Sequence, residues 1–258
     1  MAGAALAQEK VPFITTPDRV TLTMLTLAGV GQSDHLIDLG SGDGRIVITE
    51  LRRFGASGLG VELVPDLVQR SRAAAQAAGL AERVSFLEQS LFRTDLSRAS
   101  VVTMYLLPEV NLQLRPRLLD LKPGTRIVSH DWDMGDWLPD RSLTLEAPEK
   151  AIGREKRSTV HLWVVPVRVQ DLWCGQGLQI EISQRLQAFS ASLNAAAASP
   201  AAAPLWVWDG RLDGARLQAT GLRAEAEAGG MQLINLPGAA ARWAGQRLLP
   251  AQAGGCPA

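Results

Sequence analysis

The sequence contains few cysteines and no long hydrophobic segment. Among its 258 residues, only Cys174 and Cys256 carry thiols, and they lie far apart and outside any C-x-x-C pair. This spacing indicates neither a zinc site nor a disulfide framework, so we expect two unpaired thiols and no metal centre. No apolar run approaches the roughly 18 residues that a membrane-spanning helix needs, so no transmembrane segment is predicted.

The sequence also lacks an excess of charge of either sign. It has 26 Lys and Arg against 26 Asp and Glu, which gives a formal net charge of zero. Proteins that bind nucleic acids or anionic membranes over a broad surface are usually basic. The charge totals therefore indicate neither partner, and the length allows one large or two modest globular domains.

A glycine-rich turn lies between a predicted buried strand and a predicted helix. Residues 38–45 read Asp-Leu-Gly-Ser-Gly-Asp-Gly-Arg, after Leu36-Ile37 and before Ile46-Val47-Ile48. Glycines at alternate positions let the backbone turn sharply and approach a ligand, while the helix behind them supplies free N–H groups. The turn therefore predicts a binding site for a nucleoside-like cofactor.

The spacing of these glycines differs from two common nucleotide motifs. In the dinucleotide fingerprint G-x-G-x-x-G the third glycine comes one residue later, and a P-loop needs a Lys that is missing here. A second short apolar strand, 58–62, ends in Glu62, about twenty residues beyond the turn. An acid at that place in such a sheet can accept hydrogen bonds from both ribose hydroxyls.

Apolar runs alternate with helical patterns through the first two thirds of the chain. This order predicts an α/β fold with a doubly wound, mostly parallel, seven-strand Rossmann-like sheet. Thr16-Pro17-Asp18 is typical of a helix start, and the entry at Pro12–Pro17 is placed to close over the cofactor or simply to pack. The expected strands are 36–38, 58–62, 84–88, 101–105, 126–130, 143–145 and 159–165.

The pattern changes after Pro166. Alternating residues in 178–183 and several tight-turn dipeptides predict a small antiparallel β domain. We therefore divide the chain into a tail (1–11), an α/β domain (12–166), a β domain (167–250) and a disordered tail (251–258), with a low-complexity loop at 195–204.

The motif Asp38-x-Gly40-x-Gly42-x-Gly44, with Glu62 and the turn Leu121-Lys-Pro-Gly-Thr125, resembles the class I S-adenosylmethionine (SAM)-dependent methyltransferases. The resemblance covers about Pro12 to Pro166. Together with the segment Pro-Glu-Val-Asn-Leu-Gln-Leu at 108–114, the motif is most similar to bacterial methyltransferase-domain proteins and to seven-strand protein lysine methyltransferases. The latter include the non-SET histone enzyme and the mitochondrial enzymes that modify ATP synthase and the nucleotide carrier.

The resemblance implies SAM as cofactor and a set of cofactor-binding residues. In the family, a Gly-Asp pair often follows the third strand and its acid binds the adenine amine, but this sequence has Gln89-Ser90 there. Ser90, or the backbone of Ser90-Leu91, would then take that role. The implied binding residues are Asp38, Gly40, Ser41, Gly42, Asp43, Gly44, Glu62, Leu63, Ser90, Leu91 and Tyr105.

Methyl transfer from SAM is an in-line displacement, so the enzyme contributes mostly alignment and a route for a proton. The candidate catalytic residues follow the fourth and fifth strands and are Tyr105, His130 and Asp131. His130 is either a base, because imidazole titrates near neutrality, or a structural histidine. Tyr105 would line the substrate or the cofactor pocket. The fourth strand does not end in the Asp/Asn-Pro-Pro-Tyr/Phe signature of base-amine methyltransferases, which disfavours DNA amino-methylation.

Acids and indoles alternate in the loop after the fifth strand. Asp131, Asp133 and Asp136 lie near Trp132 and Trp137 in the sequence. Carboxylates attract a cation and an indole face adds a cation–π contact, which favours an amine acceptor such as a protein lysine. The other interpretation is a surface loop that its tryptophans attach to the sheet.

Alternative functions remain open from the sequence alone. A SAM-binding module without catalysis, whose β domain binds a partner, is one; a small-molecule methyltransferase is another. An NAD-dependent oxidoreductase would need a different glycine spacing. For the location we expect the cytoplasm, where SAM is made. Ala5-Leu6-Ala7 is similar to a signal-peptide cleavage site, so export after a truncated signal is the alternative.

Overall fold

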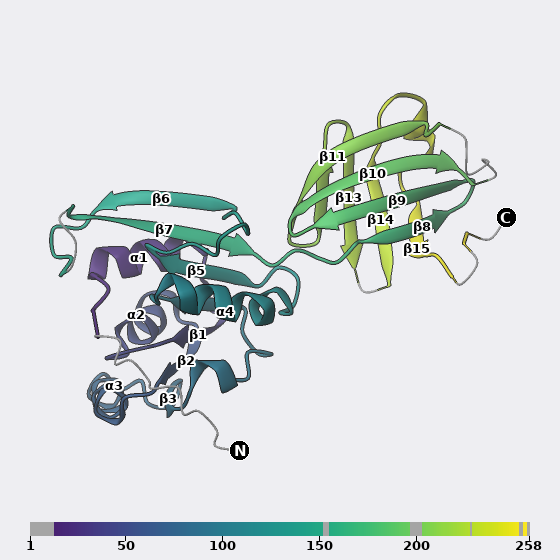
Figure 1. The fold of residues 1–258 in the computed structure, drawn as a ribbon. Coiled ribbons are helices and arrows are strands. Elements are labelled where there is room, and N and C mark those ends of the chain that lie inside the picture. Colours follow the sequence, from purple (N-terminus) through teal and green to yellow (C-terminus); the bar gives the residue numbers. More distant parts are fainter. Residues whose placement is uncertain (1–12, 152–154, 197–202, 228, 253–254, 257–258) are drawn as a thin grey trace, which may run out of the picture.

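The computed structural model describes residues 13–151, 155–196, 203–227, 229–252 and 255–256. The chain forms an α/β part with one seven-stranded sheet and, after it, a closed barrel of eight strands (Figure 1). This confirms the predicted fold class. The predicted tail at 1–11 lies outside the described residues.

The sheet has the order β3-β2-β1-β4-β5-β7-β6, in which β7 runs antiparallel to both of its neighbours. The chain moves outward in one direction from β1 to β3 and then returns to pair β4 with the other side of β1. Open α/β sheets bind ligands where the strand order reverses in this way. The strands are β1 His35–Leu39, β2 Ser57–Glu62, β3 Val84–Glu88, β4 Val101–Met104, β5 Arg126–His130, β6 Arg141–Glu146 and β7 Arg157–Val164.

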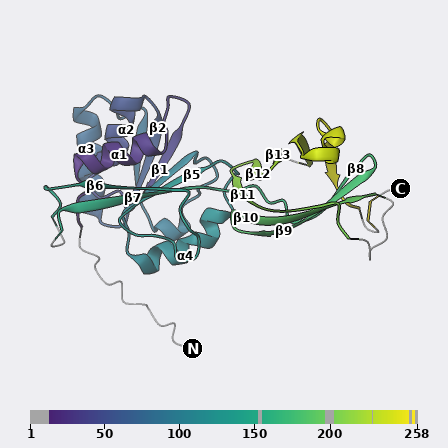
Figure 2. The same cartoon turned by 90° about the horizontal axis from the view of Figure 1, so that it is seen from above.

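Helices cover both faces of the sheet (Figure 2). On one face α1 Asp18–Leu27, α2 Arg45–Phe54 and α3 Pro65–Ala77 bury their apolar residues against the strands. On the other face, α4 Pro108–Leu119 buries its apolar residues against the strands. Leu91 of the short 3-10 helix η1 Leu91–Arg93 packs against the same apolar layer. The two apolar layers fix the positions of the strand ends that form the site.

The barrel is an up-and-down antiparallel meander, and β15 pairs with β8 to close it. Inward-facing residues of β9 alternate with exposed ones, as the sequence pattern predicted. The closure was not predicted, because it pairs Leu249 with Cys174 and Pro250 with Trp173, which lie far apart in the sequence. The elements are β8 Asp171–Gly175, β9 Leu178–Arg185, β10 Ala188–Ala195, β11 Trp206–Asp213, β12 Arg216–Ala219, β13 Leu222–Glu227, β14 Gly230–Asn235, η2 Gly238–Trp243 and β15 Arg247–Pro250.

Barrel closure corrects the prediction of two unpaired thiols. Cys174 on β8 and Cys256 form a disulfide across a sequence separation of 82 residues. Sequence spacing gave no sign of this pair, because the pairing of β8 with β15 brings the two cysteines together. In the tail predicted to be disordered, 251–258, the structure describes residues 251, 252, 255 and 256, and Gln252 and Gly255 form an isolated bridge. Within the predicted loop at 195–204, residues 197–202 lie outside the described part of the chain.

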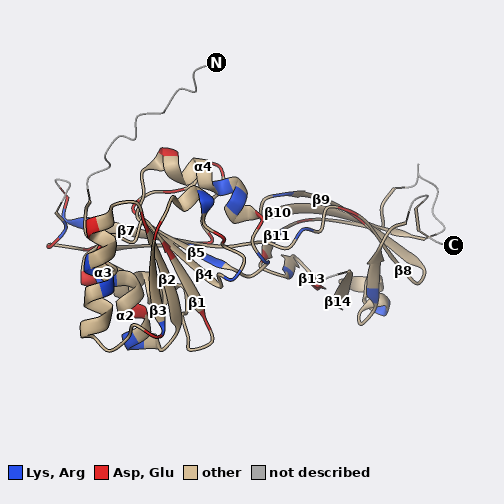
Figure 3. Ribbon diagram, turned by 90° about the horizontal axis from the view of Figure 1, so that it is seen from below, with Lys and Arg blue, Asp and Glu red and all other residues tan. Residues whose placement is uncertain are grey.

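The barrel attaches to the edge of the sheet where the parallel strands begin. Val167 N donates to Gly214 O at 2.8 Å, and a Cβ on Gly214 would lie 3.3 Å from the Gly124 Cα just before β5. Arg185 and Arg211 of the barrel pair with carboxylates of the 136–140 segment. Charges of both signs occur on both parts (Figure 3). Among the helices that the structure describes, none has the length and apolarity needed to cross a membrane.

Candidate active site

The glycine turn adopts a backbone conformation in which residues with a side chain would be strained or would clash with their neighbours. Gly42 and Gly44 have φ angles of 52° and 78°. A Cβ on Gly42 would lie 2.1 Å from the Phe13 ring, and a Cβ on Gly44 would lie 2.7 Å from the Phe86 ring. Gly40 N and Ser41 N both donate to Val61 O at 2.9 Å, which attaches the turn to β2.

Glu62 lies beside this turn, as the sequence predicted. Its Oε2 accepts from Gly42 N at 3.0 Å, and its Oε1 accepts from Leu63 N at 2.8 Å and from Val64 N at 3.0 Å. A carboxylate offers about four lone-pair directions, so three N–H groups orient it and leave it able to accept from a ligand hydroxyl.

Asp38 is buried at the end of β1, and Thr103 Oγ1 donates to its Oδ1 at 2.7 Å. Burial, together with the charges of Glu62 and Asp43, raises the pKa of Asp38 to about 7, although the hydrogen bond from Thr103 lowers it. A nearby cation would favour its ionised form. Asp43 already has such a partner, because Arg45 Nη2 lies 2.6 Å from its Oδ2.

The turn fits a polar ligand with an ammonium group, such as an amino-acid moiety. Ser41 Oγ is buried and has no hydrogen-bond partner among the described residues. Asp38 supplies a carboxyl group, and α2 begins directly behind the turn at Arg45. A helix N-terminus adds free N–H groups and a positive field.

The predicted adenine-binding residues leave neighbouring strands at the same edge. Glu62 pairs with Glu88 across β2 and β3, and Gln89 N donates to Glu62 O at 3.0 Å. Leu63 and Ser90 therefore follow these strand ends side by side. Ser90 O accepts from Thr94 Oγ1 at 3.2 Å, and the Ser90 hydroxyl makes no capping hydrogen bond to η1.

The entry segment covers the turn and reaches the next strands. The Phe13 ring lies over Gly42, and Arg45 Nη1 donates to Thr16 O at 3.2 Å. Thr16 Oγ1 is 3.3 Å from His130 Nδ1 at the end of β5. The segment therefore runs from the glycine turn to the candidate catalytic residues, and its closing over the cofactor stays a prediction.

Tyr105, His130 and Asp131 lie together beyond β4 and β5. The rings of Tyr105 and His130 are 3.9 Å apart between centroids, and Tyr105 Oη donates to Asp131 Oδ2 at 3.5 Å. Burial raises the pKa of Tyr105 to about 12, and burial lowers the pKa of His130 to about 4. His130 is therefore neutral and a weak base at pH 7, and Ser158 Oγ is 2.9 Å from its Nε2.

Asp131 has an unusual backbone conformation and an unexpected partner. Its φ is 65°, in a region where a non-glycine residue is strained. Thr159 N donates to its Oδ1 at 3.0 Å, and Lys150 Nζ lies 2.7 Å from its Oδ2. Sequence reasoning missed Lys150, because no spacing signal connects a lysine between β6 and β7 with the end of β5.

The other acids and tryptophans of the loop after β5 are mostly engaged within the protein. Trp137 is fully buried and packs against Trp163, so the prediction that it offers an indole face to a cation is wrong. Trp137 belongs to the apolar layer between the sheet and α4. Asp136 pairs with Arg115 and Arg185 instead. Trp132, 42% exposed, remains available beside Asp131.

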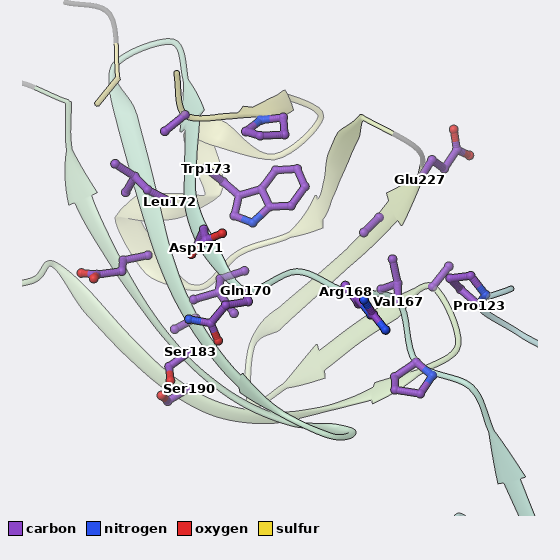
Figure 4. A pocket seen from close by; sticks show the side chains of 18 of the residues that line it. Pro123, Val167, Arg168, Gln170, Asp171, Leu172, Trp173, Ser183, Ser190 and Glu227 are labelled. Carbon is purple, nitrogen blue, oxygen red and sulfur yellow. The ribbon is translucent and has the colours of Figure 1, made fainter. Parts of the chain in front are cut away.

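A separate cavity of about 1460 Å³ lies where the barrel meets the α/β part (Figure 4). Trp173, Asp171, Arg168, Glu227 and Pro123 are among the residues that line it. Its wall comes from the barrel, the linker and the end of α4, and it contains no part of the glycine turn. The cavity therefore lies outside the candidate site.

A family model described as the ANTKMT methyltransferase domain matches residues 38–141. The chain is 38% identical over 157 residues to a protein-lysine N-methyltransferase of Saccharolobus islandicus. This match covers 60% of this chain and 94% of that protein. It is 32% identical over 131 residues to the adenine nucleotide translocase lysine N-methyltransferase of Mus musculus. This match covers 50% of this chain and 57% of that protein. The chain thus spans little more than half of the mouse enzyme.

A solved structure is also similar to this chain. The RNA methyltransferase from Salinibacter ruber, in complex with S-adenosyl-L-homocysteine, has 49% sequence identity and a TM-score of 0.56. The match covers 60% of this chain and 96% of that chain. The residues matched by the family model, 38–141, belong to the α/β part and include the glycine turn.

Proposed function

This chain belongs to the SAM-dependent protein-lysine methyltransferases of the class I fold, and from that premise we propose that it methylates the side-chain amine of lysine residues in proteins. The observation that carries the proposal is the contact of 2.7 Å between Asp131 Oδ2 and a lysine ammonium, that of Lys150. The carboxylate at the end of β5 is thus already suited to bind the kind of group that would be methylated.

Bound SAM supplies an electrophilic methyl group on a cationic sulfur. The residues suited to hold it are those of the glycine turn with Asp38, Glu62 and Ser41. Asp38 offers its carboxyl group to an ammonium, and Glu62 offers its remaining acceptor capacity to ribose hydroxyls. The implied residues Leu63 and Ser90 follow the ends of β2 and β3 and would lie beside the base.

Asp131 would orient the acceptor lysine and take its proton. A lysine is protonated at neutral pH and has to lose a proton before its nitrogen can attack carbon. The Asp131 carboxylate supports this role, because Thr159 N and Tyr105 Oη donate to it and fix its direction. The neutral His130 packs on Tyr105 and contributes position rather than proton transfer.

RNA is the second candidate acceptor, because a solved relative carries that name. The balanced charge of 26 cations and 26 anions favours protein, since phosphate contacts supply most of the affinity for RNA. The chemistry at Asp131 points the same way, because a carboxylate attracts an ammonium and repels a phosphate.

Methyl transfer from labelled SAM to a lysine-rich protein and to RNA tests the proposal. Asp131→Asn should lower kcat/KM for protein about tenfold to a hundredfold, as expected when a charged hydrogen bond is lost. Asp133→Asn is the matched control, because Asp133 is exposed and, among the described residues, its carboxylate accepts only from Gly135 N. Label confined to RNA, or equal rates in both variants, would contradict the proposal.

A further inference from the structure

We propose that Lys150 occupies the acceptor-lysine site of its own chain and is methylated there. The inference rests on the proposed function and adds a modification site, placed in the segment between β6 and β7. It follows from where Lys150 Nζ lies and from what surrounds it.

Lys150 is held as a bound substrate lysine would be. Its Nζ lies 2.7 Å from Asp131 Oδ2 and donates to Arg157 O at 2.7 Å. Only 13% of the Lys150 side chain is exposed, and only 16% of the Asp131 side chain. An ammonium has three N–H donors, so two acceptors fix its direction and one donor stays free.

The site lies close to where the methyl group would be. Phe13 covers Gly42 of the cofactor turn, and Thr16, three residues later, contacts His130 beside Asp131. Three extended residues span at most about 10 Å. Asp131 with Lys150 and the glycine turn thus lie at the same edge of the sheet, where the parallel strands end and open α/β sheets bind ligands, and the segment from Phe13 to Thr16 connects them.

Lys156 provides an internal comparison. It lies in the same segment between β6 and β7, but its side chain is exposed and its Nζ donates to Lys150 O at 2.6 Å. No carboxylate contacts it within the described residues. Two lysines of one segment thus differ in whether they reach the Asp131 carboxylate.

The step balances without a further reactant. The Lys150 ammonium passes one proton to Asp131 and from there to water. The neutral nitrogen then uses its lone pair to form the N–C bond while the S–C bond of SAM breaks, and that electron pair stays on sulfur. The products are a methylated ammonium and S-adenosylhomocysteine.

The first measurement is peptide mass spectrometry of the full chain after incubation with SAM, with a lysine-rich protein present in the same tube. We expect methyl groups on Lys150 and none on Lys156. Methylation of the chain should be lost in Lys150→Arg and kept in Lys156→Arg. The first-order rate constant should not depend on enzyme concentration, because donor site and acceptor belong to one chain.

A second measurement needs no SAM. An amine-reactive acylating reagent should modify Lys150 several-fold more slowly than Lys156, and Asp131→Asn should remove the difference. Methylation of the added protein without methylation of Lys150, a rate constant that rises with enzyme concentration, or equal acylation of both lysines in the parent chain would overturn the inference. The first of these results would leave the proposed function standing, whereas no transfer to either acceptor would refute the function itself.

Discussion

At the scale of single residues, Glu62 is central to the cofactor site. It orients the glycine turn through Gly42 N and keeps acceptor capacity for a ribose. Glu62→Ala should weaken SAM binding about tenfold to a hundredfold, because hydrogen bonds to a charged acceptor are lost. Glu88→Ala is the matched control, since Glu88 pairs with Glu62 one strand over and is exposed. Calorimetric titration with SAM measures both, and unchanged affinity in folded Glu62→Ala would refute this placement of the ribose.

The same scale shows what the sequence could reveal. The positions of Asp38, the glycines and Glu62 were predictable, because each lies at or just after the end of a strand and the fold brings these strand ends together. Trp137 was misjudged, since a loop tryptophan beside acids gives no sign of whether its indole is buried. Lys150 was missed, because its contact with Asp131 depends on how β6 and β7 return along the sheet.

At the scale of elements, α2 carries a buried acid that links stability to pH. Both carboxylate oxygens of Glu50 are buried without a hydrogen-bond partner among the described residues. Burial, with the charge of Asp34, raises the pKa of Glu50 from 4.5 to about 8. Between those values the folded chain keeps a proton that the unfolded chain has lost, so stability falls as the pH rises from about 4.5 to about 8.

Glu50→Gln should therefore flatten this decline and raise the melting temperature at pH 8. Thermal unfolding followed from pH 5 to pH 8.5 measures the effect, and Glu82→Gln, an exposed acid just before β3, is the control. Parallel curves for the parent chain and Glu50→Gln would show that the buried carboxyl group does not titrate in this range.

At the scale of the whole molecule, the disulfide links β8 of the barrel to the segment after β15. The Cys174–Cys256 bond closes a loop of 82 residues, and the chain-entropy model gives such a loop about 4 kcal/mol of stabilisation. Cys174→Ser or reduction should lower the melting temperature of the barrel and leave SAM affinity unchanged, because the barrel attaches at the opposite edge from the glycine turn. A loss of SAM binding in folded, reduced protein would contradict this separation.

The disulfide also bears on location, which stays a prediction. The supply of SAM favours the cytoplasm, whereas disulfides persist in oxidising compartments. Alkylation of thiols in intact cells before lysis distinguishes the two. Free Cys174 and Cys256 would accord with the cytoplasm, and a protected pair would accord with export.

Sequence and structure agree best for the α/β part and least for the barrel. The strand and helix periods of the first part are local signals, and the chain crossovers have one preferred hand, so a doubly wound, mostly parallel sheet could be predicted. The closure of the barrel, by contrast, depends on the pairing of Leu249 and Pro250 with β8, which no local pattern encodes. The disulfide depends on that closure in turn.

The most direct test of the central claim is the chemical identity of the methylated atom. Proteins and RNA would be incubated together with the enzyme and labelled SAM, separated, and hydrolysed to amino acids and nucleosides. The account predicts that the label elutes with ε-N-methyllysine and that Asp131→Asn strongly reduces it. Label in methylated nucleosides or in base-labile carboxyl esters, with none in methyllysine, would contradict it.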